Sequence, residues 1–290
     1  MRRGVVFVGI VLLIGAALCS VARAADEIEI SVKARSLQPG ELVVLTAATL
    51  DPVKIVRVRA FDRDIPAFQL DSRTWQALVG IDLDVRPGRY SVAIDAGTDT
   101  RSLHATTVLV VQPRKFSTRQ LQVDDAFVNP PRELTQRIEQ EAKTLAALWV
   151  RPPSVRLSDG PFVQPVPGAA TGRFGARSIF NGQPRAPHTG DDFPNAEGTR
   201  VVAPNGGRVV LARELYFAGN TVVMDHGAGL FSLLEHLSVI DVREGAAVRA
   251  GEQIGLVGAT GRVTGPHLHW GVRVNGARVD PLSLLASLGE

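Results

Sequence analysis

Five of the six histidines fall between residues 188 and 269, in a stretch that is dense in glycine. Two short spacings in this stretch could carry chemistry, HTGDD at 188–192 and HLH at 267–269. On a strand, alternate side chains share a face, so His267 and His269 are expected on one side, roughly 7 Å apart along the strand. A turn at Gly190 would fold His188 and Asp192 toward one point.

These residue types suit a zinc ion. A catalytic zinc takes three protein ligands from His, Asp, Glu or Cys and keeps a fourth position for water. Two histidines and one carboxylate leave the ion enough positive charge to polarise a carbonyl and acidify water. Each spacing alone is also common among surface residues, but the two together favour a metal site. Spacing leaves open which histidine of the HLH triplet is the ligand.

Strands must position these residues. After Arg173, apolar or β-branched runs alternate with glycine-containing turns, which predicts a mostly antiparallel β domain. These runs are 200–203, 208–213, 221–225, 230–236, 253–258 and 268–274.

The first part of the chain is also predicted to be β. Short runs separated by Pro-Gly and Asp-Pro turns predict a small Ig-like β-sandwich of about seven strands. Apolar residues at three-and-four spacing from Leu134 to Trp149 then predict one connecting helix, and 150–172 is expected to be an irregular arm. The sandwich runs are 27–33, 42–48, 54–61, 74–79, 89–95 and 105–111.

The amino terminus has the features of a signal peptide. Two arginines precede an apolar run over 4–18, and Ala22-Arg23-Ala24 supplies a small-x-small cleavage site. The run is shorter than the roughly 20 residues of a membrane span. Cleavage after Ala24 predicts an exported protein with no stable membrane insertion, most simply periplasmic, with secretion as the alternative. Arginines at 2, 3 and 23 account for the formal charge of +3, so no basic surplus indicates nucleic-acid binding.

Further motifs join the two spacings in order, namely GRFGAR at 172–177, NTVV at 220–223, EHLS at 235–238 and GLVGATG at 255–261. Over roughly 172–285 the chain resembles the lysostaphin-type (LytM-like) peptidoglycan metalloendopeptidases. The resemblance implies an antiparallel duplicated-hybrid-motif-like domain and one zinc ion per chain, held by His188, Asp192 and His269. It also implies that His236 and His267 are catalytic residues above the metal.

Two positions depart from the family pattern. Asp191 stands where relatives usually have an aliphatic residue, and Leu234 stands where an aromatic residue is common and could alter contacts in the groove. Neither is a predicted ligand. His226 is expected to be a turn residue near the site and not a ligand, and Arg173 and Asn220 are candidates for lining the groove.

The expected organisation is a mainly β chain with a signal peptide at 1–24, a β-sandwich at 25–113, a helical linker and arm at 114–171, and a peptidase domain at 172–290. The resemblance implies an endopeptidase acting on peptidoglycan stem peptides or cross-links, with peptidoglycan as its one expected partner. A non-catalytic wall-binding or amidase-activating regulator of the same fold is the alternative, but such proteins usually lack metal ligands that this chain retains. An adhesin or sugar-binding module is a further alternative, which predicts neither zinc nor cleavage.

Overall fold

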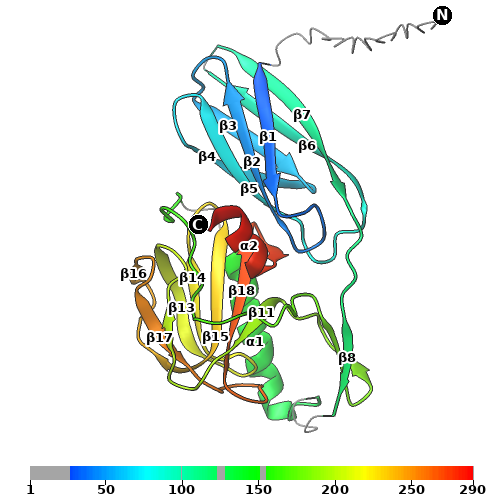
Figure 1. Cartoon of the computed structure of the whole chain (residues 1–290), viewed down its shortest axis with the longest axis vertical. Helices are drawn as coiled ribbons and strands as arrows, with labels where there is room; N and C mark the ends of the chain where they lie inside the picture. Colours follow the sequence, from blue (N-terminus) through cyan, green and yellow to red (C-terminus); the bar gives the residue numbers. More distant parts are fainter. Residues whose placement is uncertain (1–26, 99, 123–127, 151–154, 290) are drawn as a thin grey trace, which may run out of the picture.

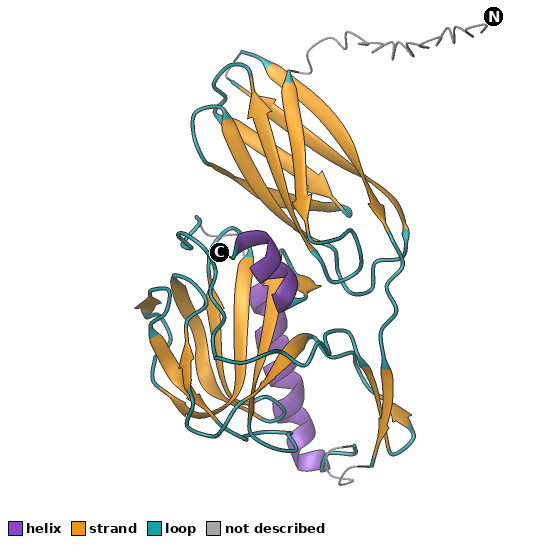
Figure 2. Ribbon diagram, viewed as in Figure 1, coloured by secondary structure: helices purple, strands orange, loops and turns teal. Residues whose placement is uncertain are grey.

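The computed structural model describes residues 27–98, 100–122, 128–150 and 155–289, so the predicted signal peptide lies outside the described residues. Two bodies built mainly of strands lie one above the other, with a long helix beside the lower one (Figures 1 and 2). In the described part of the chain, no helix has the length and apolar character needed to cross a membrane.

The N-terminal body is one antiparallel sheet of seven strands in the order β1-β2-β5-β4-β3-β6-β7. The sheet curls into a near-barrel, which brings β1 close to β7 and encloses a core of Val, Ile, Leu and Ala side chains. Its strands are β1 (Ile28–Ala34), β2 (Leu42–Thr49), β3 (Ile55–Ala60), β4 (Arg63–Gln69), β5 (Thr74–Gly80), β6 (Gly88–Gly97) and β7 (Ser102–Val111).

Six of these strands lie where the sequence predicted them, whereas β4 was not predicted. Its sequence RDIPAFQ carries charges and Pro66, which are unfavourable in strands. The hairpin into β4 turns at Phe61 and Asp62, with φ of 51° and 58°. Aspartate is common in such turns, but Phe61 is not a residue that marks one in a sequence.

The connecting segment confirms the predicted helix. After β7 the chain forms β8 (Thr118–Leu121), which pairs in parallel with β9 (Arg177–Phe180), and β9 forms a hairpin with β10 (Gln183–Pro184). Helix α1 spans Arg132–Trp149, and Leu148 is its buried residue. The described residues of the predicted arm, 150 and 155–172, form neither a helix nor one of the numbered strands, which agrees with the irregular structure expected there.

The C-terminal body is a nine-stranded sheet in which β11-β18-β15-β14-β13-β16 form the main path. All its pairings are antiparallel, and β12 joins through β17, which pairs with β15. Its strands are β11 (Gly190–Pro194), β12 (Arg200–Val202), β13 (Gly207–Leu215), β14 (Gly219–Asp225), β15 (Leu230–Ile240), β16 (Ala247–Val248), β17 (Gln253–Val257), β18 (His267–Val274) and β19 (Ala277–Val279), followed by α2 (Pro281–Leu288).

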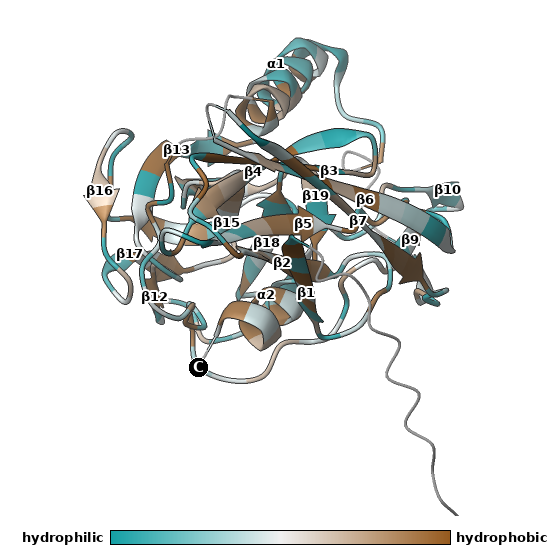
Figure 3. Ribbon diagram, turned by 90° about the horizontal axis from the view of Figure 1, so that it is seen from above, coloured by the Kyte–Doolittle hydropathy of each residue, from teal (hydrophilic) through white to brown (hydrophobic). Residues whose placement is uncertain are grey.

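The two faces of this sheet carry different helices. Leu284 of α2 packs into the main core with Leu234 of β15, whereas Leu148 of α1 packs on the other face with Phe231 and Leu233. Seen from above, α1 and α2 accordingly lie on opposite sides of β15 and β18 (Figure 3). Because side chains alternate along β15, odd-numbered residues up to Glu235 face the α1 side.

A buried polar seam joins the two bodies. Arg35 forms ion pairs with Glu41 at 2.6 Å and with Asp280 at 2.8 Å, and Arg114 pairs with Asp280 at 3.0 Å. Ser283 of α2 donates to Glu41 at 2.7 Å. Both acids are nearly inaccessible, with exposed fractions of 2% and 3%. Apolar residues continue the seam, since Leu42, Val44 and Leu78 of the upper sheet belong to the core cluster of the lower one.

Candidate metal centre

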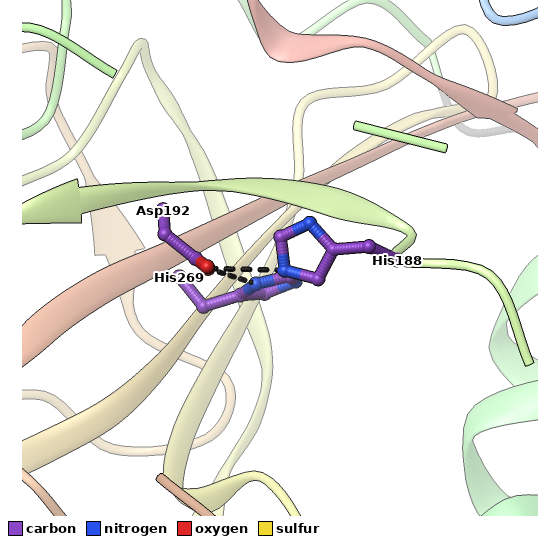
Figure 4. A group of neighbouring side chains, drawn as sticks. All are labelled: His188, Asp192 and His269. Atoms are coloured by element: carbon purple, nitrogen blue, oxygen red, sulfur yellow. Dashed lines mark hydrogen bonds and ion pairs between the residues drawn. The ribbon is translucent and has the colours of Figure 1, made fainter. Parts of the chain in front are cut away.

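Three side chains from two distant parts of the chain converge on the α1-facing side of the C-terminal sheet (Figure 4). His188 lies just before β11, Asp192 lies within β11, and His269 of β18 is its direct partner in the register. Asp192 Oδ1 lies 3.0 Å from His188 Nε2 and 2.9 Å from His269 Nδ1. Ligand atoms of all three residues lie within 4.8 Å of one another.

The geometry favours His269 over His267 as the third ligand, a choice that spacing left open. His267 and His269 share a face of β18, as predicted, and Leu268 between them is fully buried on the other face. The Nε2 atom of His267 lies 3.6 Å from Asp192 Oδ1, farther than His269 Nδ1. His267 therefore stands beside the three converging groups.

The predicted turn at Gly190 is wrong. Gly190 begins strand β11 and pairs with Gly271 of β18, and its φ is not positive. His188 and Asp192 instead lie on either side of a residue without a side chain, and their side chains lean toward each other (Figure 4). The space above Gly190 is filled by His269, because an added Cβ there would lie 2.6 Å from His269 Nε2.

A hydrogen bond fixes which nitrogen His188 presents to the other two side chains. His188 Nδ1 lies 3.3 Å from the carbonyl oxygen of Arg173, to which it can only donate, so the lone pair is on Nε2. Burial disfavours the charge on Asp192, but the adjacent imidazoles of His188 and His269 hold the pKa of its carboxyl well below its usual range. Asp192 is therefore anionic at neutral pH.

A β-bulge brings His236 to the same site. Between β14 and β15 the register shifts, with Asn220 opposite Leu237 but Val222 opposite Leu234. One extra residue on β15 is accommodated, and His236 takes a φ of 67°. Without the bulge, alternation would direct this side chain to the core face with Leu234. Instead its ring centroid lies 6.0 Å from that of His269.

His236 and His267 present the same ring nitrogen to the site. His236 Nδ1 lies 3.0 Å from the carbonyl oxygen of Thr260, and His267 Nδ1 lies 2.9 Å from that of Gly265. Both Nδ1 atoms must donate, so each neutral ring keeps an acceptor lone pair at Nε2. The two centroids are 4.9 Å apart. Burial, reinforced by the neighbouring imidazoles of His269 and His267, lowers the pKa of His236 to about 3.

Sequence reasoning missed Glu235, which is the direct partner of His269 across β15 and β18. Burial raises the pKa of the Glu235 carboxyl. Burial opposes a charge on His269, yet the carboxylates of Glu235 and Asp192 raise the pKa of that imidazole. No local signal in the sequence marks Glu235, because its place beside His269 follows from the pairing of β15 with β18.

Other predicted positions have structural roles. Leu234 is fully buried in the core, so the expectation that it contacts the groove is wrong. His226 is also fully buried, and its ring hydrogen bonds to Gly206 and Ser232; it is not among the three converging groups. Asn220 supports the bulge by donating to the carbonyl of Leu237 at 3.0 Å.

The donor set fits zinc. Two imidazole nitrogens and one carboxylate oxygen are the ligands of an open catalytic zinc site, whereas calcium and magnesium favour sites built of oxygen atoms. His188 and Asp192 are partly exposed and His269 is buried, so the group is open on one side. His236 and His267 flank it with their Nε2 lone pairs.

Comparison with known proteins identifies the family. The family model for peptidase family M23 matches residues 186–281, which include all five site residues predicted from the sequence. A solved structure of a peptidase M23 from Pseudomonas aeruginosa is 31% identical, covers 87% of this chain and 96% of that chain, and superposes with a TM-score of 0.67. The chain belongs to peptidase family M23.

Curated relatives match about a third of the chain. Peptidoglycan DD-endopeptidase ShyA of Vibrio cholerae is 46% identical over 97 residues, which are 33% of this chain and 23% of that protein. DD-carboxypeptidase/endopeptidase Mpg of Neisseria meningitidis is 44% identical over 97 residues, which are 33% of this chain and 22% of that protein. This M23 chain thus matches less than a quarter of the length of these two relatives.

Proposed function

We propose that this M23 protein is a zinc-dependent metalloendopeptidase that hydrolyses peptide bonds in peptidoglycan. The observation that carries the proposal is the convergence of His188, Asp192 and His269 beside two further imidazoles. The names of the matched relatives, which are peptidoglycan DD-endopeptidases, support this substrate. They also favour cross-linked stem peptides over glycine bridges.

Each group in the site has a role in such a reaction. A bound zinc ion would supply a Lewis acid that polarises the scissile carbonyl and acidifies water. The Nε2 atom of His267 or His236 accepts the proton of the attacking water, because both rings hold their lone pair on that side. The imidazolium formed in this way then donates from Nε2, stabilising the oxyanion of the tetrahedral intermediate and finally passing the proton to the leaving amine. No acyl-enzyme is required.

Replacing a proposed ligand tests the proposal. Wild-type protein should bind one zinc ion per chain and release muropeptides from purified sacculi. His269→Ala should lose both the metal and the release, whereas His104→Ala, at an exposed position on β7, should keep both. Metal content by plasma mass spectrometry and product masses provide the readout. Full zinc content together with full hydrolysis in His269→Ala would refute the ligand assignment.

The alternative is a regulator of the same fold that binds the wall or activates an amidase without cutting. It predicts that purified protein leaves sacculi intact while binding them or stimulating an added amidase. The complete ligand set is what favours the enzyme.

Several finer features belong to the same proposal. They are the Ig-like arrangement of the N-terminal sheet, the duplicated-hybrid-motif arrangement of the C-terminal one, and the division at residues 24, 113 and 171. Export to the periplasm, with cleavage after Ala24, is also part of it. Mass spectrometry of the protein recovered from a periplasmic extract would test the cleavage site.

A further inference from the structure

The side chain next to the ligand Asp192 is a buried carboxylate. Asp191 alternates with Asp192 along β11, so it faces the core side of the sheet, and its exposed fraction is 0%. Burying a carboxylate without an ionic partner is unfavourable. Among the described residues, no Lys, Arg or His side chain forms an ion pair with Asp191. An aliphatic side chain would fill this core position without that cost, so packing alone does not explain why the residue is an aspartate.

One oxygen of Asp191 accepts three hydrogen bonds. Its Oδ1 receives the Thr171 hydroxyl at 2.9 Å, the Arg173 amide at 3.0 Å and the Asp192 amide at 2.9 Å. Its Oδ2 is buried without a hydrogen-bond partner among the described residues. The side chain therefore uses one atom to join the segment 171–173 to the strand that carries Asp192.

The segment joined in this way holds His188, the proposed ligand that lies just before β11. The carbonyl of Arg173 is the group that receives His188 Nδ1, at 3.3 Å. His188 is further tied by backbone bonds, from its amide to Ala176 at 2.9 Å and from Gly175 to its carbonyl at 2.8 Å. The same Arg173 residue thus donates its amide to Asp191 and accepts from the ring of His188.

We propose that Asp191 is a positioning residue for the metal ligand His188, acting through the backbone of Arg173. The carboxylate fixes the Arg173 amide, the Arg173 carbonyl fixes the imidazole, and the imidazole then presents Nε2 to the metal. Groups that orient a ligand in this way typically change metal affinity by about 10–100-fold when removed. The inference rests on the proposed zinc site and assigns Asp191 no contact with the metal or substrate.

Zinc affinity of the metal-free full chain tests the role directly, measured by competition with a chromophoric chelator. Asp191→Val keeps a small core side chain but removes the acceptor, and should bind zinc about 10–100-fold more weakly. Asp191→Asn keeps a carbonyl oxygen at the Oδ1 position and should bind within about threefold of wild type. Thr171→Val removes one donor but leaves the Arg173 link, and should also stay near wild type.

The outcomes are separable. If wild-type protein fails to bind zinc, the proposed function is wrong; if it binds and folded Asp191→Val binds equally well, the positioning role is wrong. A role in stability alone would change the melting temperature of Asp191→Val without changing zinc affinity. If that variant does not fold, amide hydrogen exchange of wild-type protein decides. Zinc should slow the exchange of the Arg173 amide, and unchanged exchange would overturn the inference.

Discussion

His269 occupies the space that a side chain at Gly190 would need. A Cβ built on Gly190 would lie 2.6 Å from His269 Nε2 and 2.4 Å from the Trp270 carbonyl oxygen. Gly190, which pairs with Gly271 of β18, thus leaves room for the His269 ring above the sheet.

Gly190→Ala should therefore weaken zinc binding. Either the His269 ring must tilt away or the two strands must separate, and overpacking of this kind costs about 1–3 kcal/mol. Chelator competition and urea unfolding would measure both effects. Gly88→Ala is the matched control, because its Cβ would meet only the Tyr90 ring at 3.7 Å. Wild-type zinc affinity in Gly190→Ala would contradict the packing argument.

Removing either flanking imidazole should separate binding from turnover. His267→Ala and His236→Ala are each expected to keep zinc and lose at least about 100-fold in muropeptide release, since general acid–base groups contribute about 10²–10⁴-fold. Zinc content and initial rates on purified sacculi are the two measurements. Intact turnover in one variant would exclude that residue from the reaction.

At His236 the left-handed backbone should make a glycine variant more stable than an alanine variant, which reverses their usual order of stability in a strand. At an ordinary strand position glycine is less stable than alanine by about 0.5–1 kcal/mol. At a φ of 67°, however, a Cβ costs about 1–2 kcal/mol. His236→Gly should thus unfold at a higher urea concentration than His236→Ala, although both lack the imidazole. The same pair of changes at Thr106 on β7, which lacks a positive φ, should show the ordinary order.

The buried His226 should make stability depend on pH. Burial lowers the pKa of His226 to about 4, compared with an unfolded value of about 6.5. The unfolded chain therefore binds the extra proton first as pH falls. The contribution of the neutral His226 to the free energy of unfolding is complete above about pH 6.5. It is lost progressively as pH falls to about 4, by up to about 3 kcal/mol.

Replacing His226 with a residue that does not titrate isolates its contribution to the pH dependence of stability. His226→Gln should flatten the fall in the free energy of unfolding between pH 7 and pH 4.5, as measured by urea denaturation. His104→Gln, at an exposed position, should leave the wild-type slope unchanged. Parallel curves for His226→Gln and wild type would show that burial does not suppress protonation there.

Local patterns predicted the parts of the fold that local chemistry determines. Alternation in HLH correctly placed His267 and His269 on one face, and the three-and-four spacing correctly located α1. Strand β11 was missed because GDDFP contains two acids and a proline, which are rare in strands. It forms because it pairs with β18, a strand nearly 80 residues further along the sequence.

The bulge at His236 could not be read from the sequence for a similar reason. Nothing in EHLS marks a positive φ, because the usual signal would be glycine or asparagine. The shift arises from how β15 matches β14, which only the assembled sheet defines. The family resemblance predicted a catalytic role for His236. The bulge explains how its ring reaches the site.

The ion pairs of Arg35 and Arg114 with Glu41 and Asp280 have a mechanical consequence. They lock the upper sheet to the base of helix α2, so a torque applied to one body is transmitted to the other. A partner bound to the N-terminal sheet would therefore keep a fixed orientation relative to the histidine cluster of the C-terminal sheet.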